Sequence, residues 1–211
     1  RQRQMCIRDS IWIDRKRVTE MEPKDRGIAM VFQNYALYPH MSVEENMAWG
    51  LKIRGMGKGL IAERVQEAAR ILELDGLLKR RPRELSGGQR QRASLARGLA
   101  LKPSLLIADE PTSALDVSVQ AKVLELFKRL QAEIGFACLF ITHDLAVVDM
   151  LADRIMVMHK GQIVEHGDAD QIMQHPENPY TKKLLASLPV PDPREQQQHR
   201  AHLHELLAQE A

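Results

Sequence analysis

The 211-residue sequence is poor in cysteine, with only Cys6 and Cys138, which excludes the dense disulfide framework of a small secreted domain. It also lacks long apolar runs. The longest, at residues 105–108 and 137–142, are far shorter than the roughly 20 residues that cross a bilayer as a helix. No charged-then-apolar signal peptide opens the chain. These absences predict a cytosolic protein, and Cys138, inside an apolar run, is predicted to be a buried, reduced thiol.

A strong net charge is missing as well. The formal charge is only +2, from 30 basic and 28 acidic side chains, so no bulk field recruits nucleic acid or an anionic membrane surface. Any contact with a membrane is therefore expected to go through a protein partner. With 44% hydrophobic and 27% charged residues, the chain can bury one sizeable core and fits a single domain.

The periodicity of apolar residues predicts alternating strands and helices. Residues 28–32 form an apolar run that predicts a buried strand stopping at Gln33, and residues 61–72 show helical spacing. A second helix is predicted to start near residues 86–88 and to continue through Ala100. Helices and a sheet are therefore both expected in one α/β chain.

Residues 105–141 form the clearest unit. An apolar run at 105–108, helical spacing over 119–130 and a second apolar run at 137–141 predict a βαβ crossover with two buried parallel strands. The strands end in Asp109-Glu110 and Thr142-His143. Because α/β folds bind ligands at the carboxyl edge of the sheet, these polar pairs mark a candidate site.

The two ends of the chain have a different character. Residues 1–10 show neither helix nor strand period, and we expect them not to be native protein sequence. Residues 154–158 and 162–165 flank a Lys160-Gly161 turn and predict a hairpin. Beyond Leu188 the chain is rich in proline, glutamine and histidine, which predicts a loose tail over 189–211.

Two short motifs carry the chemistry. Ser86-Gly87-Gly88-Gln89 precedes a predicted helix and offers a hydroxyl and free backbone N–H groups at a positive helix terminus, which suits a phosphate. Asp109-Glu110 directly follows an apolar strand, the arrangement that puts one carboxylate on Mg²⁺ and the next beside an attacking water. Taken alone, the first is also an ordinary helix start and the second a solvated strand end.

The order of the motifs distinguishes between these interpretations. In chain order they are Gln33 after a strand, residues 85–89, the strand ending in Asp109-Glu110, residues 113–116 and His143 after a further strand. This series resembles the Q-loop, signature, Walker B, D-loop and switch histidine of ABC ATPases. The five motifs stand in the family's order and spacing from residue 33 to 143, and at lower specificity the resemblance extends to about residue 188.

The resemblance implies roles for the catalytic residues. Asp109 would help to hold Mg²⁺, Gln33 would sense the metal and the water, Glu110 would polarise the hydrolytic water, and His143 would contact the γ-phosphate of ATP.

It also implies an assembly. Ser86, Gly87, Gly88 and Gln89 would clamp ATP held by the opposite subunit, and Asp116 would line the interface. The implied working unit is a head-to-tail dimer with two nucleotides between its subunits, docked on transmembrane permease subunits.

One family element has no match in the sequence. The phosphate-binding loop reads G-x-x-x-x-G-K-[ST], and no window satisfies it; near Gly57-Lys58, position 52 is Lys and position 59 is Gly. In the family this loop and an adenine-stacking aromatic precede the Q-loop, so we expect both upstream of Ile11. The chain alone is therefore expected to hold the carboxylates and the clamp for the opposite ATP, without its own cradle, and to be inactive.

The sequence also resembles two branches of the family. VFQNYALYPHM at 31–41, within residues 11–92, resembles the ATPases of sugar and glycerol-3-phosphate importers. ADEPTSALD at 108–116 and HPENPYT at 175–181 resemble the dipeptide and oligopeptide importer branch. A recombined or misassembled sequence is the simplest interpretation.

By resemblance, the groove that receives the membrane subunit's helix would be formed by residues 33–49. This stretch supplies a cluster of aromatic and flexible apolar side chains of the kind enriched at interfaces: Tyr35, Leu37, Tyr38, Met41, Met47 and Trp49. Several of them could instead pack the helical subdomain.

These observations predict an α/β, P-loop NTPase-like ABC ATPase domain over residues 11–188, with a helical subdomain about 35–89 and without its first strands and phosphate-binding loop. The implied function is ATP hydrolysis energising solute import, with sugar, glycerol-3-phosphate or peptide as cargo. The expected location is the cytoplasmic face of the bacterial inner membrane, and no nucleic-acid partner is expected. The alternatives are an inactive fragment or chimera, or a non-transport ABC-class ATPase of DNA repair or translation.

Overall fold

The computed structural model describes residues 10–13, 15–113 and 115–187. The chain divides into two compact units, residues 1–141 and residues 142–211. Among the described residues, no helix combines the length and apolarity that crossing a membrane requires. The predicted tail at 189–211, Cys6 and nearly all of the segment 1–10 lie outside the described residues.

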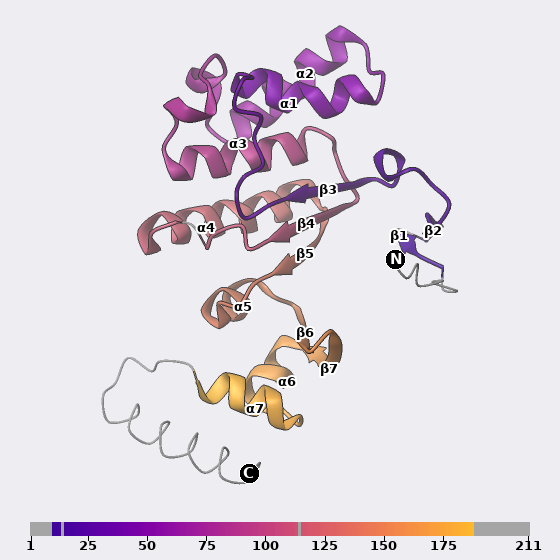
Figure 1. The fold of residues 1–211 in the computed structure, drawn as a ribbon, viewed down its shortest axis with the longest axis vertical. Coiled ribbons are helices and arrows are strands. Elements are labelled where there is room, and N and C mark those ends of the chain that lie inside the picture. Colours follow the sequence, from indigo (N-terminus) through magenta and orange to yellow (C-terminus); the bar gives the residue numbers. More distant parts are fainter. Residues whose placement is uncertain (1–9, 14, 114, 188–211) are drawn as a thin grey trace, which may run out of the picture. The chain divides into compact units, whose positions relative to one another are not determined.

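A three-stranded parallel sheet forms the centre of the first unit (Figure 1). Its strands are β3 (Ile28–Val31), β4 (Leu105–Asp109) and β5 (Ala137–Ile141), in that spatial order. In the register, Val31 lies opposite Ala108, and Ala108 lies opposite Phe140. The predicted βαβ crossover is therefore present, and all three strands end at one edge.

Two helices pack against one face of this sheet. Helix α3 (Gly87–Leu99) approaches it at Gly98, where an added Cβ would lie 3.4 Å from Leu106. Helix α4 (Val117–Ile134) inserts Phe127, whose ring meets those of Phe136 and Phe140 edge-on at centroid distances of 5.9 and 5.7 Å. Part of the core therefore lies between this face and the two helices.

The opposite face of the sheet corrects one prediction. Strand β5 was predicted to be buried on both sides, but Leu139 and Ile141 are 37% and 44% exposed. The reason is that β5 is the edge strand of the described sheet, and its residues alternate between the helix-covered face and the open one. Cys138, on the covered side, is a free and only half-buried cysteine.

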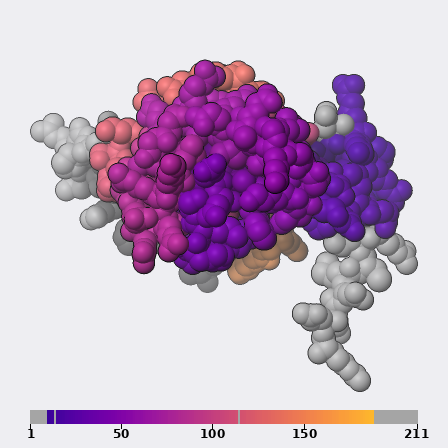
Figure 2. Space-filling view, turned by 90° about the horizontal axis from the view of Figure 1, so that it is seen from above, coloured from indigo at the N-terminus to yellow at the C-terminus, as the bar shows by residue number. Residues whose placement is uncertain are grey.

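The chain between β3 and α3 is helical. Helix α1 (Val43–Ile53) starts with a capping box between Ser42 and Glu45, and helix α2 (Lys58–Ile71) follows. Their apolar faces meet α3, burying among others Met47, Leu51 and Leu72. Figure 2 shows these helices, in purple to magenta, as one continuous surface. Short 3₁₀ turns complete the region: η2 (Asp75–Leu77) and η3 (Pro82–Glu84).

Before β3 the chain forms a small antiparallel pair. Strand β1 (Trp12–Ile13) pairs with β2 (Lys16–Arg17), and the 3₁₀ turn η1 (Pro23–Asp25) leads on to β3. Val18, which follows β2, is buried.

The second unit contains the predicted hairpin. Strands β6 (Arg154–His159) and β7 (Gln162–Asp168) are antiparallel and joined by Lys160-Gly161, both at positive φ. In the described part of this unit, three short helices accompany them: α5 (Leu145–Leu151), α6 (Ala169–Gln174) and α7 (Pro179–Ala186). The Tyr180 ring stacks on His159 at 3.9 Å between centroids, which fixes α7 against the hairpin.

Candidate functional site

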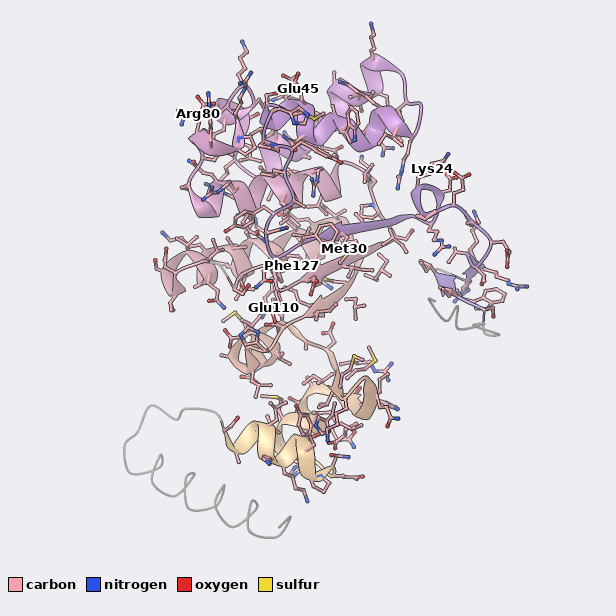
Figure 3. The ribbon with its side chains drawn as sticks, in the orientation of Figure 1. Lys24, Met30, Glu45, Arg80, Glu110 and Phe127 are labelled. Carbon is pink, nitrogen blue, oxygen red and sulfur yellow. The ribbon has the colours of Figure 1, made fainter. Side chains whose placement is uncertain are left out.

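The predicted site residues Gln33 and Glu110 leave the sheet at the same edge. Gln33 follows Val31 by two residues and Glu110 follows Ala108 by two, and Val31 and Ala108 are partners in the register. In Figure 3, Glu110 lies at the end toward which the strand arrows point. This is the edge where α/β sheets bind ligands.

Glu110 has an unusual backbone conformation. Its φ is +48°, a left-handed value that costs a residue with a side chain about 1–2 kcal/mol. The surrounding chain holds it there: the Glu110 N–H donates to the Ile141 carbonyl at 2.9 Å, and the Ser113 hydroxyl donates to the Glu110 carbonyl at 3.0 Å. A strained backbone persists only where the surrounding structure holds it, and such residues are concentrated at functional sites.

The oxygen donors at this edge fit part of a Mg²⁺ site. Asp109 ends β4 with a half-buried carboxylate, and Gln33 offers an amide oxygen beyond β3. Mg²⁺ prefers such ligands and commonly takes only one or two from protein, with phosphate oxygens and waters completing its shell. Among the described residues no cluster of three or more histidine, cysteine or acidic side chains could hold a metal ion.

The signature turn is built by a reciprocal cap. Ser86 is the N-cap of α3; its hydroxyl accepts from the Gln89 N–H at 3.3 Å, while the Gln89 side chain accepts from the Ser86 N–H at 2.9 Å. This capping box fixes both side chains at the positive end of the helix. The remaining N–H groups of the first turn can meet an anion.

The glycines of this turn allow α3 and α4 to approach closely. A Cβ at Gly88 would lie 2.8 Å from Cγ1 of Val119, a distance that real Cβ atoms do not adopt. A Cβ at Gly87 would lie 3.4 Å from Leu115 and 3.8 Å from the Tyr35 hydroxyl. The signature turn therefore touches the D-loop directly.

Asp116 caps the other helix. Its carboxylate accepts from the Ser118 hydroxyl at 2.7 Å and from the Val119 N–H at 3.0 Å. The Ser118 hydroxyl and then the Val119 amide stabilise the charged form, so the pKa of Asp116 lies below its usual value. Asp116 is exposed and stays anionic at the start of α4.

Signature turn and D-loop share one cleft of about 650 Å³. Its lining includes Ser86, Gly87 and Gly88 from the signature turn and Leu115 and Asp116 from the D-loop. The structure thus brings Ser86, Gly87 and Gly88 of the predicted clamp to the same cleft as Asp116.

His143 belongs to the second unit, in the turn after β5. The turn is held by Thr142, whose hydroxyl accepts from the Asp144 N–H at 3.0 Å, and Asp144 caps α5 through the Ala146 N–H at 3.1 Å. His143 is exposed in this turn.

Three polar residues near the site escaped the sequence analysis. Asn46, Ser94 and Arg97 all hydrogen-bond to backbone atoms of the segment that follows Gln33, and the side chains of Asn46 and Ser94 are buried. The available signal was weak: Ser94 is a polar residue between Ala93 and Leu95 in a predicted helix.

A family profile shows to which family the chain belongs. The profile described as ABC transporter matches residues 2–113, which is more than half of the chain. The chain belongs to the ABC transporter family. A second profile, described as the C-terminal region of oligopeptide/dipeptide transporters, matches residues 164–210.

Relatives of this ABC chain include the sn-glycerol-3-phosphate import ATP-binding proteins UgpC. That of Escherichia coli O1:K1 / APEC is 58% identical over 177 residues, which cover 84% of this chain and 50% of the relative. That of Salmonella typhi is 57% identical over the same length. The chain thus spans about half the length of the relatives it matches. A glycerol-3-phosphate-type resemblance together with a peptide-type C-terminal region confirms the predicted mixture of two branches.

The fold has a solved counterpart. The dimeric, post-hydrolysis structure of the ATP-binding cassette MJ0796 bound to ADP and Pi is 30% identical, with a TM-score of 0.64, and the match covers 76% of this ABC chain and 73% of that chain. The predicted α/β ABC ATPase fold is confirmed.

Proposed function

We propose that this ABC chain is part of the ATP-binding and ATP-hydrolysing subunit of an importer, at the cytoplasmic face of the inner membrane. The observation that carries the proposal is the carboxyl edge of the sheet, where Asp109, a strained Glu110 and Gln33 leave adjacent strands. Relatives that are named as import ATP-binding proteins support the proposal, because one of them is 58% identical to this chain over 177 residues.

The mechanism assigns one task to each side chain. Glu110, held by its bonds to Ile141 and Ser113, would accept a proton from the water that attacks the γ-phosphate. Asp109 and Gln33 would hold Mg²⁺, which when bound neutralises phosphate charge. His143 would contact the γ-phosphate from the turn before α5.

The clamp residues serve a second nucleotide. Ser86, Gly87, Gly88 and Asp116 line a common cleft, and an ATP carried by an opposite subunit would rest there on the N-terminus of α3. The MJ0796 structure, described as dimeric, supports a dimer, and we propose that its two subunits lie head to tail with two nucleotides between them.

The surface for a membrane subunit is proposed around Tyr38. Tyr38 and Trp49 are 39% and 40% exposed, with ring centroids 6.0 Å apart and an edge-on geometry, and the His40 ring lies 6.1 Å from Tyr38. Met47, which the sequence analysis included in this surface, is fully buried, because its side of α1 faces the core shared with α3. The exposed aromatic set is the kind that supplies interface hot spots.

The catalytic assignment can be tested in an extended chain, in which the preceding segment of the Escherichia coli UgpC relative is joined to this sequence. Glu110→Gln should keep ATP binding but slow hydrolysis by about two orders of magnitude or more, because the amide fills the same space and cannot accept the proton. An ATP-stabilised dimer should then be visible by light scattering. The matched control is Glu63→Gln, on the exposed side of α2. Normal hydrolysis by the Glu110 variant would refute its role.

The partner assignment has its own test. The extended chain is co-expressed with sugar-type or with peptide-type membrane subunits, and co-purification is compared. Because the Tyr38 surface belongs to the glycerol-3-phosphate-like part, capture by sugar-type subunits is expected, and Tyr38→Ala should weaken it. Preferential capture by peptide-type subunits would overturn the assignment, and undiminished capture after the substitution would remove Tyr38 from the interface.

A further inference from the structure

The segment just after Gln33 takes a conformation that its side chains do not favour. Tyr35 and Ala36 have φ values of +63° and +46°, so two consecutive residues with side chains are left-handed. Each costs about 1–2 kcal/mol relative to an ordinary conformation. Such a turn persists only where surrounding structure holds it.

Helix α3 supplies the holding contacts. The Ser94 hydroxyl donates to the Tyr35 carbonyl at 2.8 Å. The Arg97 guanidinium donates to the Ala36 carbonyl through one nitrogen and to the Tyr35 carbonyl at 3.3 Å through another. At the other end of the same face, the Arg90 guanidinium lies 5.7 Å from the centre of the Tyr35 ring. The turn is thus tied to α3 at both its backbone and its side chain.

The two α3 residues that hold the turn are wholly or partly buried. Ser94 is completely buried, and burial of the Arg97 side chain lowers its pKa, although an arginine stays charged at neutral pH. Arg97 is half-buried, and a guanidinium that donates two N–H groups to carbonyls makes charge-assisted bonds, which are stronger than neutral ones.

The geometry points to a positioning function. Helix α3 begins at Ser86 with the signature turn and, two to three helical turns later, holds the chain two residues after Gln33. We propose that Ser94 and Arg97 are positioning residues that set Gln33 in register with the signature turn of the same subunit. A shift of the signature helix then moves Gln33 with it. This inference rests on the proposed ATPase function, and it concerns residues to which that function assigns no task.

The first experiment uses the 211-residue chain itself. Hydrogen–deuterium exchange is followed in peptides that cover residues 33–41 for Arg97→Met, Ser94→Ala and Arg54→Met. Arg54 is the matched control. Its guanidinium also donates to a backbone carbonyl, that of Leu101 at 3.3 Å, but this bond does not involve the turn at Tyr35 and Ala36. Exchange should become roughly ten-fold faster in the two α3 variants and stay unchanged in the control. Equal exchange in all variants would overturn the inference.

The second experiment separates positioning from simple stabilisation. In the extended chain, kcat and KM for ATP are measured for Arg97→Met, Gln33→Ala and the double variant. Arg97→Met should lower kcat about ten-fold or more with KM changed less than about two-fold, and it should cost almost nothing further once Gln33 is absent. Arg97→Lys, with one point donor in place of a fork, should recover only part of the loss.

The outcomes are distinct. If the unsubstituted extended chain hydrolyses no ATP, the proposed function fails and the positioning role fails with it. If the chain hydrolyses ATP and the costs of Arg97→Met and Gln33→Ala are additive, the positioning role alone is refuted. Strong coupling in the double variant, together with faster exchange over residues 33–41, supports it.

Discussion

Replacing Asn46 with alanine should destabilise the first unit, because this side chain organises the turn that presents Tyr38. Asn46 lies on α1 and is completely buried. Its amide nitrogen donates to the carbonyls of Tyr38, Met41 and Ser42 at 3.1, 3.3 and 2.9 Å, and its oxygen accepts from the Tyr38 N–H at 2.7 Å. One side chain therefore closes the loop between the Q-loop and α1.

The magnitude follows from these bonds. The two amide hydrogens of Asn46 cannot make three full bonds, so two donated bonds and one accepted bond are counted. At about 1 kcal/mol net for each, Asn46→Ala should cost about 3 kcal/mol of unfolding free energy, and more where Tyr38 N–H finds no water. For a protein of this size, that lowers Tm by roughly 6–12 °C.

Urea unfolding followed by Trp49 fluorescence measures the effect, since the Trp49 ring is 6.0 Å from Tyr38. A Trp12→Phe background leaves Trp49 as the single tryptophan. The matched control is Asn34→Ala, at an exposed position of the same connection, which should change stability by less than about 0.5 kcal/mol. A cost for Asn46→Ala below about 1 kcal/mol would refute the reasoning.

Three further outcomes are expected. The 211-residue chain by itself should release negligible phosphate from Mg-ATP, because no lysine-bearing loop holds the β- and γ-phosphates in line; turnover typical of an intact ABC ATPase would contradict this. Gly88→Ala should lower Tm, because its Cβ would lie 2.8 Å from Val119, whereas Gly59→Ala, which meets nothing within 4 Å, should not. Burial raises the pKa of Cys138 to about 12, so in a Cys6→Ser chain its thiol should resist alkylation at pH 8 until urea is added. Because the thiol pKa is higher in the folded chain than in the unfolded one, the contribution of Cys138 to the free energy of unfolding is full below pH 9.0 and is lost as the pH rises toward 12. Urea midpoints measured as a function of pH would show this loss.

Much of the site could be predicted because its signals are local. A buried strand followed by Asp109-Glu110 places two carboxylates at a sheet edge whatever surrounds them. Ser86 and Gln89 stand three residues apart, which is the spacing of a capping box, and the box is present. Strand, turn and helix propensities act over a few residues, so the elements could be read locally, and the fold was predicted from the resemblance of the motif order to that of ABC ATPases.

Other features depend on which surfaces meet, and no local pattern carries that information. Apolar spacing shows that Ile141 belongs to a strand, but only the sheet order makes that strand an edge with one open face. Helical period groups Met47 with its neighbours on α1, but only packing against α3 buries it. The left-handed turn at Tyr35 and Ala36 has no sequence signature without glycine. It exists because Ser94 and Arg97, about 60 residues away along the chain, offer donors to its carbonyls, and only the tertiary structure brings those donors there.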